Sequence, residues 1–425
     1  MNFTAEKERF ATDQQKAAIL ACDVHKDEII LFTKFGKRNI CRDFANRTEP
    51  IERGLKELIG CAHLAGIEDI LLVAEPTGPY HNTLMRTARS LGLMTAFAGA
   101  EHVAKMRVIE SNDTGKTDKK DPRVIHTLAR VGKILQHRIL PEPYCLLREW
   151  NKVYDAADRR VVEAKCAIHN QVKALFPDYD FKKDFIFSPS GRALMQRYGC
   201  NPYRIVRAGW KRFCAGMKKQ APRIQWRSLK RLYESAQSSM KYGIPERQAA
   251  VIELRLLQLL EDLEIHEKRK DKAEKVMIEL YEAARKDDPK LPLGVPGAIS
   301  TFHLARVVAE TGPWSDFGTV RQFQRFAGQN LRERKSGKYK GKTKISKKGR
   351  TLFRKVANLI VLPLVKKHAL FGAYYHNKTE TMKGAKAMMA VARKVLKMIF
   401  GWYRSDQAFD RKRVFACESQ YRKAA

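Results

Sequence analysis

The sequence predicts an α/β domain at the N-terminus, followed by mainly helical structure. Short apolar runs bounded by polar turns mark the first part, whereas charged, helix-favouring residues fill the middle. The chain has 425 residues, more than one domain usually holds, so more than one core is expected. We therefore expect three parts, at residues 1–144, 145–287 and 288–425.

The N-terminal part alternates apolar runs with amphipathic stretches. Strands are predicted at residues 17–23, 28–35, 39–44, 69–74 and 93–98, and helices at 50–65, 80–91 and 122–135. Pro122 suits the first turn of the last helix, where a backbone N–H is not needed. Three strands, a helix and a further strand predict a sheet covered by helices.

The middle part shows no strand pattern and is predicted to be helical. Its clearest feature is a seam with alternating spacings of four and three, formed by Ile252, Leu256, Leu259, Leu263, His266, Lys270, Ala273, Met277 and Leu280. Such a coiled-coil seam can pair the helical arms of two protomers, or it can pack one helix within its own chain. Both interpretations stay open, because His266 and Lys270 weaken two positions of the seam.

The C-terminal part begins with a turn rich in glycine and proline, Gly294 to Gly297, followed by a helical pattern. This order predicts a helix-hairpin-helix-like motif, which can present backbone N–H groups to a phosphate. A strongly basic stretch, Arg332 to Arg354, comes next, and apolar helices then continue to about Trp402. The residues from Arg411 onward are expected to form a frayed basic tail.

The charge of the chain indicates its partner. Lys and Arg number 82 against 46 Asp and Glu, and a net charge of +36 favours nucleic acid. No apolar run is long enough to cross a bilayer, and MNFTAEKERFATDQQK lacks the apolar centre of a secretory signal, so a cytoplasmic protein is expected. The eight cysteines form no CxxC pair, which argues against a disulfide framework or a zinc cluster.

Four acidic residues stand out by their placement. Asp23 and Glu75 each end a predicted strand, and Asp118 and Asp121 precede a predicted helix. Carboxylates that converge at a sheet edge repel one another unless cations neutralise them, and oxygen ligands suit Mg²⁺. Two such ions can stabilise the entering and leaving oxygens of a phosphoryl transfer. The alternative is that these residues only form turns or helix caps.

Several segments resemble a known family. ACDVHKDEI, VAEPTGPYHNTL and KTDKKDPRVIHTLA are similar to the three signature blocks of the DEDD transposases of the insertion-sequence "one-ten" family, whose first domain is similar to the RuvC resolvase and has an RNase H-like fold. LPLGVPGAIST, ETGPWSDFGTVRQFQRFAG and KSGKYKGKTKISKKGRTLFRKVA resemble the second, transposase domain of that family. The resemblance covers about residues 17–140 and 288–402, and residues 178–245 lie outside it.

The resemblance implies a recombinase that excises and inserts a mobile DNA element. The metal-binding acids of the family map onto Asp23, Glu75, Asp118 and Asp121, and its nucleophilic serine maps onto Ser336. It further implies Mg²⁺, donor and target DNA, a structured non-coding bridge RNA and a homo-oligomer, a dimer or tetramer, in a bacterial or archaeal cytoplasm at the nucleoid.

Ser336 also has to meet a chemical requirement. A serine hydroxyl is a weak nucleophile unless a base, a metal or strong electrostatic stabilisation assists it. The basic side chains expected to contact nucleic acid around it are Arg334, Lys335, Lys338, Lys340, Lys342, Lys344, Lys347, Lys348 and Arg350. The alternative is a flexible loop that contacts phosphates without chemistry. Ser346, the rival nucleophile, is expected to cap a helix that begins near Lys347.

Two other functions remain possible at this point. The first is a RuvC-like structure-selective nuclease, in which water attacks the phosphate and Ser336 only contacts it. The second is a non-catalytic RNA-binding protein, which the charge supports but which gives no reason for acids at the strand ends.

Overall fold

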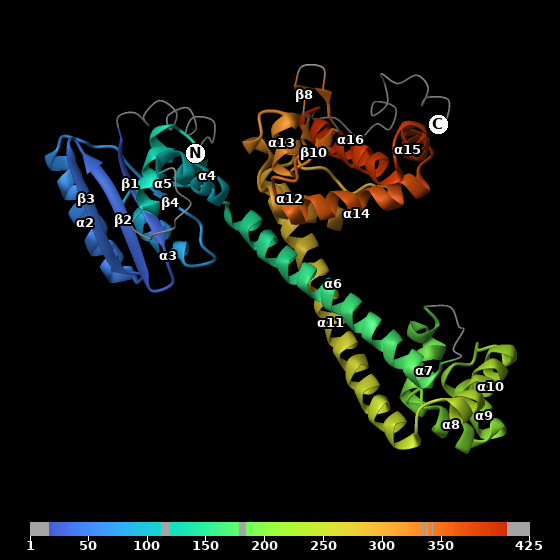
Figure 1. Ribbon diagram of the computed structural model, residues 1–425. Helices are drawn as coiled ribbons and strands as arrows, with labels where there is room; N and C mark the ends of the chain where they lie inside the picture. The colour runs from blue at the N-terminus through green and yellow to red at the C-terminus, as the bar shows by residue number, and fades with distance from the viewer. Residues whose placement is uncertain are drawn as a thin grey trace. The chain divides into compact units, whose positions relative to one another are not determined.

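The computed structural model describes residues 17–111, 120–177, 184–333, 335–336, 339–341 and 343–405. The chain divides into two compact units, Met1–Ile139 and Leu140–Ala425. The first unit is α/β and the second is mostly helical, in agreement with the fold class expected from the sequence (Figure 1).

The first unit is built on a six-stranded sheet in the order β3-β2-β1-β4-β5-β6. Its strands are β1 (Ala18–Val24), β2 (Glu28–Phe35), β3 (Arg38–Ala45), β4 (Ile70–Ala74), β5 (Met94–Phe97) and β6 (Leu135–Gln136). The first three strands form an antiparallel meander, β4 and β5 run parallel to β1, and β6 is antiparallel to β5. This mixed sheet is consistent with the RNase H-like domain that the resemblance implies.

Helices cover both faces of this sheet. They are α2 (Thr48–Leu64), α3 (His81–Ser90), α4 (Ala100–Ser111) and α5 (Asp121–Arg130). Leu20 of β1 packs in a cluster with residues of α2 and α3, whereas its neighbour Ile19 packs in a cluster with residues of α5. A strand that is buried on both faces is apolar at every position, which explains the uninterrupted apolar runs of β1 and β4.

Helix α4 and strand β6 were not predicted from the sequence. Helix α4 lacks a continuous apolar stripe: Val103 is buried, but Val108 and Ile109 are exposed. Without the spacing of an amphipathic helix, the segment gives no helical signal. Strand β6 has only two residues, too few for a strand pattern to be visible.

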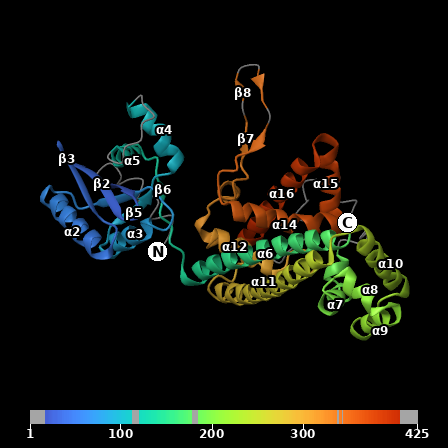
Figure 2. The ribbon, with the colours of Figure 1, turned by 60° about the horizontal axis from the view of Figure 1, so that its bottom comes forward.

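The second unit contains two long antiparallel helices that lie side by side, α6 (Glu142–Leu175) and α11 (Glu246–Asp287) (Figures 1 and 2). Leu256 and Leu263 of the predicted seam are buried in one cluster with Ile168 of α6. At Lys270, a weak position of the seam, the Nζ lies 2.7 Å from the Oδ1 of Asp158 of α6. The seam therefore packs within its own chain, and pairing between protomers remains a prediction.

Between α6 and α11 the structure describes five helical elements, with residues 178–183 outside the description. They are η1 (Phe185–Phe187), α7 (Pro189–Tyr198), α8 (Pro202–Ala208), α9 (Trp210–Gln220) and α10 (Trp226–Tyr242). We call residues 184–245 the distal lobe. Its core includes Phe213, Met217 and Leu229, in the same cluster as Val172 of α6. The predicted interruptions near residues 177–189 and 242–245 coincide with the ends of α6 and α10.

The rest of the second unit is a helical body. Its elements are α12 (Thr301–Thr311), η2 (Trp314–Asp316), α13 (Val320–Phe326), α14 (Thr351–Lys367), α15 (Ala369–Thr381) and α16 (Gly384–Ser405). Phe323 lies at the centre of the core, where its ring stacks on Phe400 with centroids 5.0 Å apart. The predicted basic tail from Arg411 lies outside the described residues.

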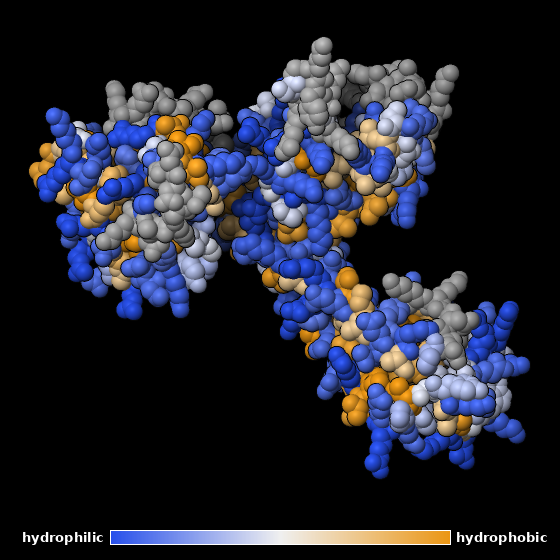
Figure 3. Space-filling model, in the orientation of Figure 1, coloured by the Kyte–Doolittle hydropathy of each residue, from blue (hydrophilic) through white to orange (hydrophobic). Residues whose placement is uncertain are grey.

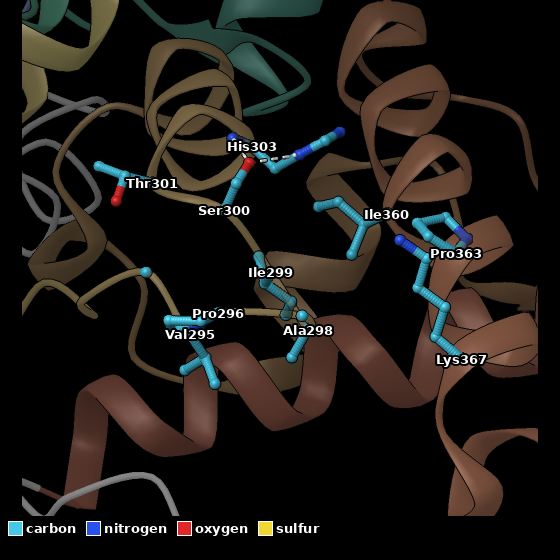
Figure 4. Close-up of a pocket in the computed structure, with 12 residues that line it drawn as sticks. Val295, Pro296, Ala298, Ile299, Ser300, Thr301, His303, Ile360, Pro363 and Lys367 are labelled. Atoms are coloured by element: carbon cyan, nitrogen blue, oxygen red, sulfur yellow. Dashed lines mark hydrogen bonds between the residues drawn. The ribbon is translucent and has the colours of Figure 1, made fainter.

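The predicted Gly/Pro-rich turn lies directly before α12. Ser300 caps this helix by accepting a hydrogen bond from the His303 backbone N–H at 3.3 Å, and its Oγ lies 2.7 Å from the Nδ1 of His303 (Figure 4). The turn, the start of α12 and side chains of α14, including Pro363 and Lys367, line a pocket of about 390 Å³.

No single helix in the described part of the chain is long and apolar enough to cross a membrane. Helices α14 and α15 together reach the required length and composition, but they meet at an angle of 102°.

Candidate active site

The first candidate site is the edge of the sheet at the carboxyl ends of β1 and β4. These parallel strands pair up to Cys22 and Ala74, and the Glu75 backbone N–H donates to the Cys22 carbonyl oxygen at 3.3 Å. Asp23 follows Cys22, so the two acids occupy the ends of neighbouring strands, as the sequence predicts. Asp23 is only 6% exposed, and a carboxylate buried to this degree requires a positive partner or hydrogen-bond donors.

Helix α5 covers the face of the sheet on which Asp23 lies. Because side chains alternate along a strand, Asp23 shares its face with Ala21, which packs in a cluster with Ile125 of α5. Phe32 of β2 is the register partner of Ala21, and the ring of His126 packs edge-on against it with centroids 5.3 Å apart. The first turns of α5 therefore lie over the same region of the sheet as Asp23.

His126 is buried in this layer, where it is 7% exposed. Burial, together with Arg130 and Lys34, lowers the pKa of His126 to about 4. The imidazole is therefore neutral at physiological pH, and it acts as part of the packing under α5 rather than as a charged group.

Asp121 is the first residue of α5 and is 2% exposed. Arg107 of α4 binds the Asp121 carboxylate in a bidentate manner. Its Nε donates to Oδ1 at 2.8 Å and its Nη2 donates to Oδ2 at 2.7 Å. On the neighbouring strand end, the Nε2 of His25 lies 3.4 Å from the Oδ2 of Asp23. Two buried carboxylates thus each have a positively charged or ionisable neighbour.

Arg107 was missed in the sequence analysis, since α4 gave no helical signal and a single arginine carries no pattern. Asp118, the fourth predicted acid, lies outside the described residues. Among the residues that are described, no three His, Cys, Asp or Glu side chains form a group that could hold a metal ion. The four-acid cluster therefore remains a prediction.

The second candidate site is a β-hairpin arm in the second unit, formed by the described residues among 331–345, which are 331–333, 335–336, 339–341 and 343–345. At its base β7 (Leu331–Arg332) pairs with β10 (Lys344–Ile345), and nearer its tip β8 (Lys335–Ser336) pairs with β9 (Tyr339–Lys340) (Figure 2). Ser336 faces Tyr339 in this register and is exposed. The basic stretch is thus a paired arm that carries the serine, not simply a loop.

The base of the arm is fixed by a close crossing of two chain segments. A Cβ on Gly349 would lie 2.5 Å from the Gly328 nitrogen, so only glycine allows this approach. The Ser346 backbone N–H donates to the Asn330 carbonyl oxygen at 2.8 Å, and the Ser346 Oγ contacts the Asn330 side chain. These contacts set the direction in which the arm leaves the helical body.

The prediction that Ser346 caps a helix near Lys347 is wrong. Helix α14 begins at Thr351, and Lys347 adopts a positive φ of 56°. Ser346 accepts a hydrogen bond from the Lys348 backbone N–H at 3.3 Å, but its hydroxyl is held at the base of the arm by Asn330. A contact between distant segments has replaced the local cap.

The predicted basic contacts fall into three groups. Arg334, Lys338 and Lys342 lie outside the described residues, and the backbones of Lys335 and Lys340 form the paired strands of the arm. Lys344, Lys347 and Lys348 are exposed. Arg350 differs from these, because its Nε lies 2.8 Å from the Oε2 of Glu310.

Glu310 belongs to a buried polar network that the sequence analysis did not identify. It is 1% exposed and accepts a hydrogen bond at 3.0 Å from Asn151 of α6. Asn151 in turn accepts one at 2.9 Å from Arg306, which is 2% exposed. A signal was present in the sequence: Arg306 and Glu310 stand four apart in the otherwise apolar run LARVVAET. Through Arg350 the network ties the start of α14, and thus the base of the arm, to α12 and α6.

Replacing Glu310 by glutamine should destabilise the second unit. The change leaves the buried Asn151 and the half-buried Arg350 without their carboxylate partner, and we expect the free energy of unfolding to fall by about 1–3 kcal/mol. Urea unfolding of the full chain measures this difference. Glu279→Gln, an exposed acid on α11, is the matched control and should change stability by less than about 0.5 kcal/mol. Equal effects of the two variants would contradict a stabilising role for the network.

Comparison with known proteins identifies the class of this enzyme. Residues 20–177 match the DEDD transposase family of IS110 type, and residues 294–376 match the family described as transposase IS116/IS110/IS902. The first segment contains Asp23, Glu75 and Asp121, and the second contains Ser336. The protein is therefore a DNA transposase, an enzyme that acts on DNA, with a domain type that uses divalent metal.

More specifically, the chain belongs to the IS110 family of transposases of insertion sequences. A comparison with curated proteins gives no match. The distal lobe lies outside both matched segments.

Proposed function

We propose that this transposase cuts and exchanges DNA strands through a covalent serine–DNA intermediate, with Mg²⁺ at the acidic edge and a structured RNA as guide. The observation that carries the proposal is the exposed position of Ser336 on a paired, basic arm. A serine that only packs or caps would be enclosed by its own chain, whereas this hydroxyl is accessible to a DNA phosphate.

The acidic edge fits a divalent metal. Asp23 and Asp121 are buried carboxylates on the α5 side of the sheet, and Glu75 ends the strand beside Asp23. Together with Asp118 they would supply the oxygen ligands that Mg²⁺ prefers. When bound, the metal would neutralise charge on the phosphate under attack. Arg107 holds the Asp121 carboxylate in a fixed orientation at 2.7–2.8 Å.

In the proposed reaction the Oγ of Ser336 attacks the phosphorus of a DNA phosphodiester. A new bond between Oγ and phosphorus forms as the bond from phosphorus to the leaving sugar oxygen breaks, and the proton of the hydroxyl is released to a base or solvent. The lysines of the arm stabilise the negative charge on the phosphate oxygens. A strand end then attacks the serine–phosphate bond, which rejoins DNA and frees the serine.

The other parts of the chain have proposed roles in binding. The turn from Gly294 to Gly297 and the start of α12 would hold a backbone phosphate. The α6 and α11 helices would contribute to a homo-oligomer, a dimer or tetramer. Donor DNA, target DNA and the bridge RNA would share the basic surface, and the three parts at 1–144, 145–287 and 288–425 would act as acidic domain, connector and serine domain.

Binding of DNA and RNA should weaken steeply as salt is added. Contacts between Lys or Arg and phosphates release counterions, so the affinity falls as a power of the salt concentration. Neutralising Lys344, Lys347 and Lys348 by glutamine should lower the slope of log affinity against log salt by roughly 2–3 for duplex DNA. The measurement is a series of binding titrations between low and physiological salt. An affinity that barely changes with salt would show that the +36 charge serves another purpose.

A nuclease that uses water is the second candidate, since its acidic edge would have the same geometry. The two differ in one product: only the serine mechanism leaves protein joined to cleaved DNA. Trapping that adduct with purified protein, with and without the associated RNA, decides between them. A non-catalytic RNA-binding protein, the third possibility, would be unaffected by removal of Mg²⁺.

A further inference from the structure

The distal lobe carries a concentration of positive charge that its packing does not explain. Residues 184–245 contain 13 Lys and Arg against two acids, Asp184 and Glu234, a net charge of 13 − 2 = +11. Helix α11, which follows directly, has nine Lys and Arg against eleven Asp and Glu. The excess positive charge of the lobe therefore does not extend into the helix that follows it.

Some of these cations bind the lobe to α11. Arg192, Arg204 and Arg207 pair with acids of α11 at Glu267, Glu253 and Glu246 respectively. These pairs add to the apolar contact between the lobe and α11, whose Leu256 and Leu263 lie in the same cluster as the lobe core. Ten other cations of the lobe remain.

Six of the ten remaining cations lie on α9, on the turn after it and on the first turn of α10. Five of them are exposed and make no ion pair or hydrogen bond through their side chains with any residue that the structure describes: Lys211, Arg212, Lys219, Arg223 and Arg227. The opposite face of α9, with Phe213 and Met217, is buried in the lobe core. Like charges brought together in this way repel one another, and a polyanion relieves the repulsion.

An aromatic side chain lies among these cations. Trp226, the first residue of α10, is 60% exposed, although its ring is the largest apolar group of that helix. The Nζ of Lys218 lies 5.0 Å from the centroid of its ring. Leu229 and Leu232 form the buried face of α10, so Trp226 is not needed for the core. Figure 3 shows hydrophilic side chains projecting from the lobe around its few apolar patches.

We propose that the α9–α10 surface of the distal lobe binds a single-stranded segment of nucleic acid. The unpaired cations contact successive phosphates, and Trp226 stacks on a base. The strand is single because an indole can stack only on a base that is not already stacked within a duplex. RNA and DNA share this chemistry. The inference rests on the proposed function only in that a transposase handles nucleic acid; it involves neither the acids nor Ser336.

The test uses the full chain in the presence of a chelator, so that no cleavage occurs. The variant replaces Arg212, Lys219, Arg223 and Arg227 by glutamine. The matched control replaces four exposed cations of α11 by glutamine: Lys268, Arg269, Lys272 and Lys275. Affinity for a single-stranded RNA, a single-stranded DNA and a duplex of the same sequence is measured over a range of salt concentrations.

For single strands, the slope of log affinity against log salt should be less steep by roughly 3 in the lobe variant, about 0.7 for each lost phosphate contact. The control variant should keep the wild-type slope. Comparison of the affinities for the single-stranded RNA and the single-stranded DNA shows which of the two the lobe prefers. A lobe variant whose slope equals that of the control overturns the proposal.

The stacking is tested separately. Trp226→Ala should weaken single-strand binding roughly 5- to 150-fold and leave duplex binding unchanged, whereas Trp226→Phe should retain most of the affinity. Ultraviolet crosslinking of the wild type should join the strand to the peptide that contains Trp226. Equal losses for duplex and single strand, or crosslinks only elsewhere, reject the stacking. The catalytic proposal is tested by cleavage and adduct formation, whereas this one is tested by binding in a chelator, so a failure of the catalytic proposal is distinguishable from a failure of this one.

Discussion

Ser336→Ala is expected to abolish strand exchange while leaving nucleic-acid binding intact. The substitution removes one oxygen from an exposed position and leaves every charge of the arm in place. If the hydroxyl attacks phosphorus, activity should fall by several orders of magnitude and no protein-linked DNA should form, as expected for the loss of a covalent nucleophile. The readouts are recombination of a donor–target pair and a denaturing gel for the adduct.

Ser346→Ala is the comparison variant. Its hydroxyl helps to hold the base of the arm through Asn330, so its loss should reduce the rate by about tenfold or less, because about 1 kcal/mol of hydrogen bonding is removed. The adduct should still form in this variant. An adduct formed by Ser336→Ala, or normal recombination by this variant, would contradict the serine mechanism. It would favour a nuclease in which water attacks the phosphate at the acidic edge.

The second large effect is expected for Asp23→Asn. Asparagine has nearly the same shape, but it removes the negative charge from the buried end of β1, so a divalent metal should no longer bind tightly there. We expect strand cleavage to fall by several orders of magnitude. A readout independent of activity is the rise in thermal unfolding temperature on adding Mn²⁺ or Mg²⁺, which should be present in the wild type and lost in the variant.

Asp43→Asn serves as the control for this prediction. Asp43 lies on β3 of the same sheet and is exposed, so its replacement should preserve both cleavage and stabilisation by metal. If Asp23→Asn retained full metal-dependent stabilisation, the assignment of the strand ends as a metal site would be wrong.

The sequence was sufficient to locate the acids because the strands that carry them are buried on both faces. Uninterrupted apolar runs followed at once by Asp23 and Glu75 define the ends of β1 and β4, and neighbouring parallel strands bring those ends together. The ion pair of Asp121 with Arg107 was not visible, because it depends on how α4 packs. No local pattern in α4 reveals that packing.

The paired strands of the arm around Ser336 could not be predicted from sequence patterns, for a different reason. Its strands are two residues each and are held mainly by backbone hydrogen bonds, so they need no alternation of apolar and polar side chains. Composition alone, rich in Lys, Ser and Gly, suggests a loop. The incorrect cap at Ser346 has a similar origin, since Asn330, distant in sequence, competes successfully for the hydroxyl.

Because the arm leaves the helical body at the crossing of Gly328 and Gly349, a small rotation at that crossing displaces Ser336 by a larger distance. Ser336 lies six residues beyond Asn330, a separation of at most roughly 20 Å, since an extended chain rises about 3.3 Å per residue. A rotation of about 10° at the crossing would therefore shift the serine hydroxyl by about 3 Å, and a displacement of even about 1 Å can slow a positioned reaction on the order of a hundredfold. A side chain at either glycine, which would force the two segments apart, should consequently damage catalysis from a site that never touches the DNA phosphate.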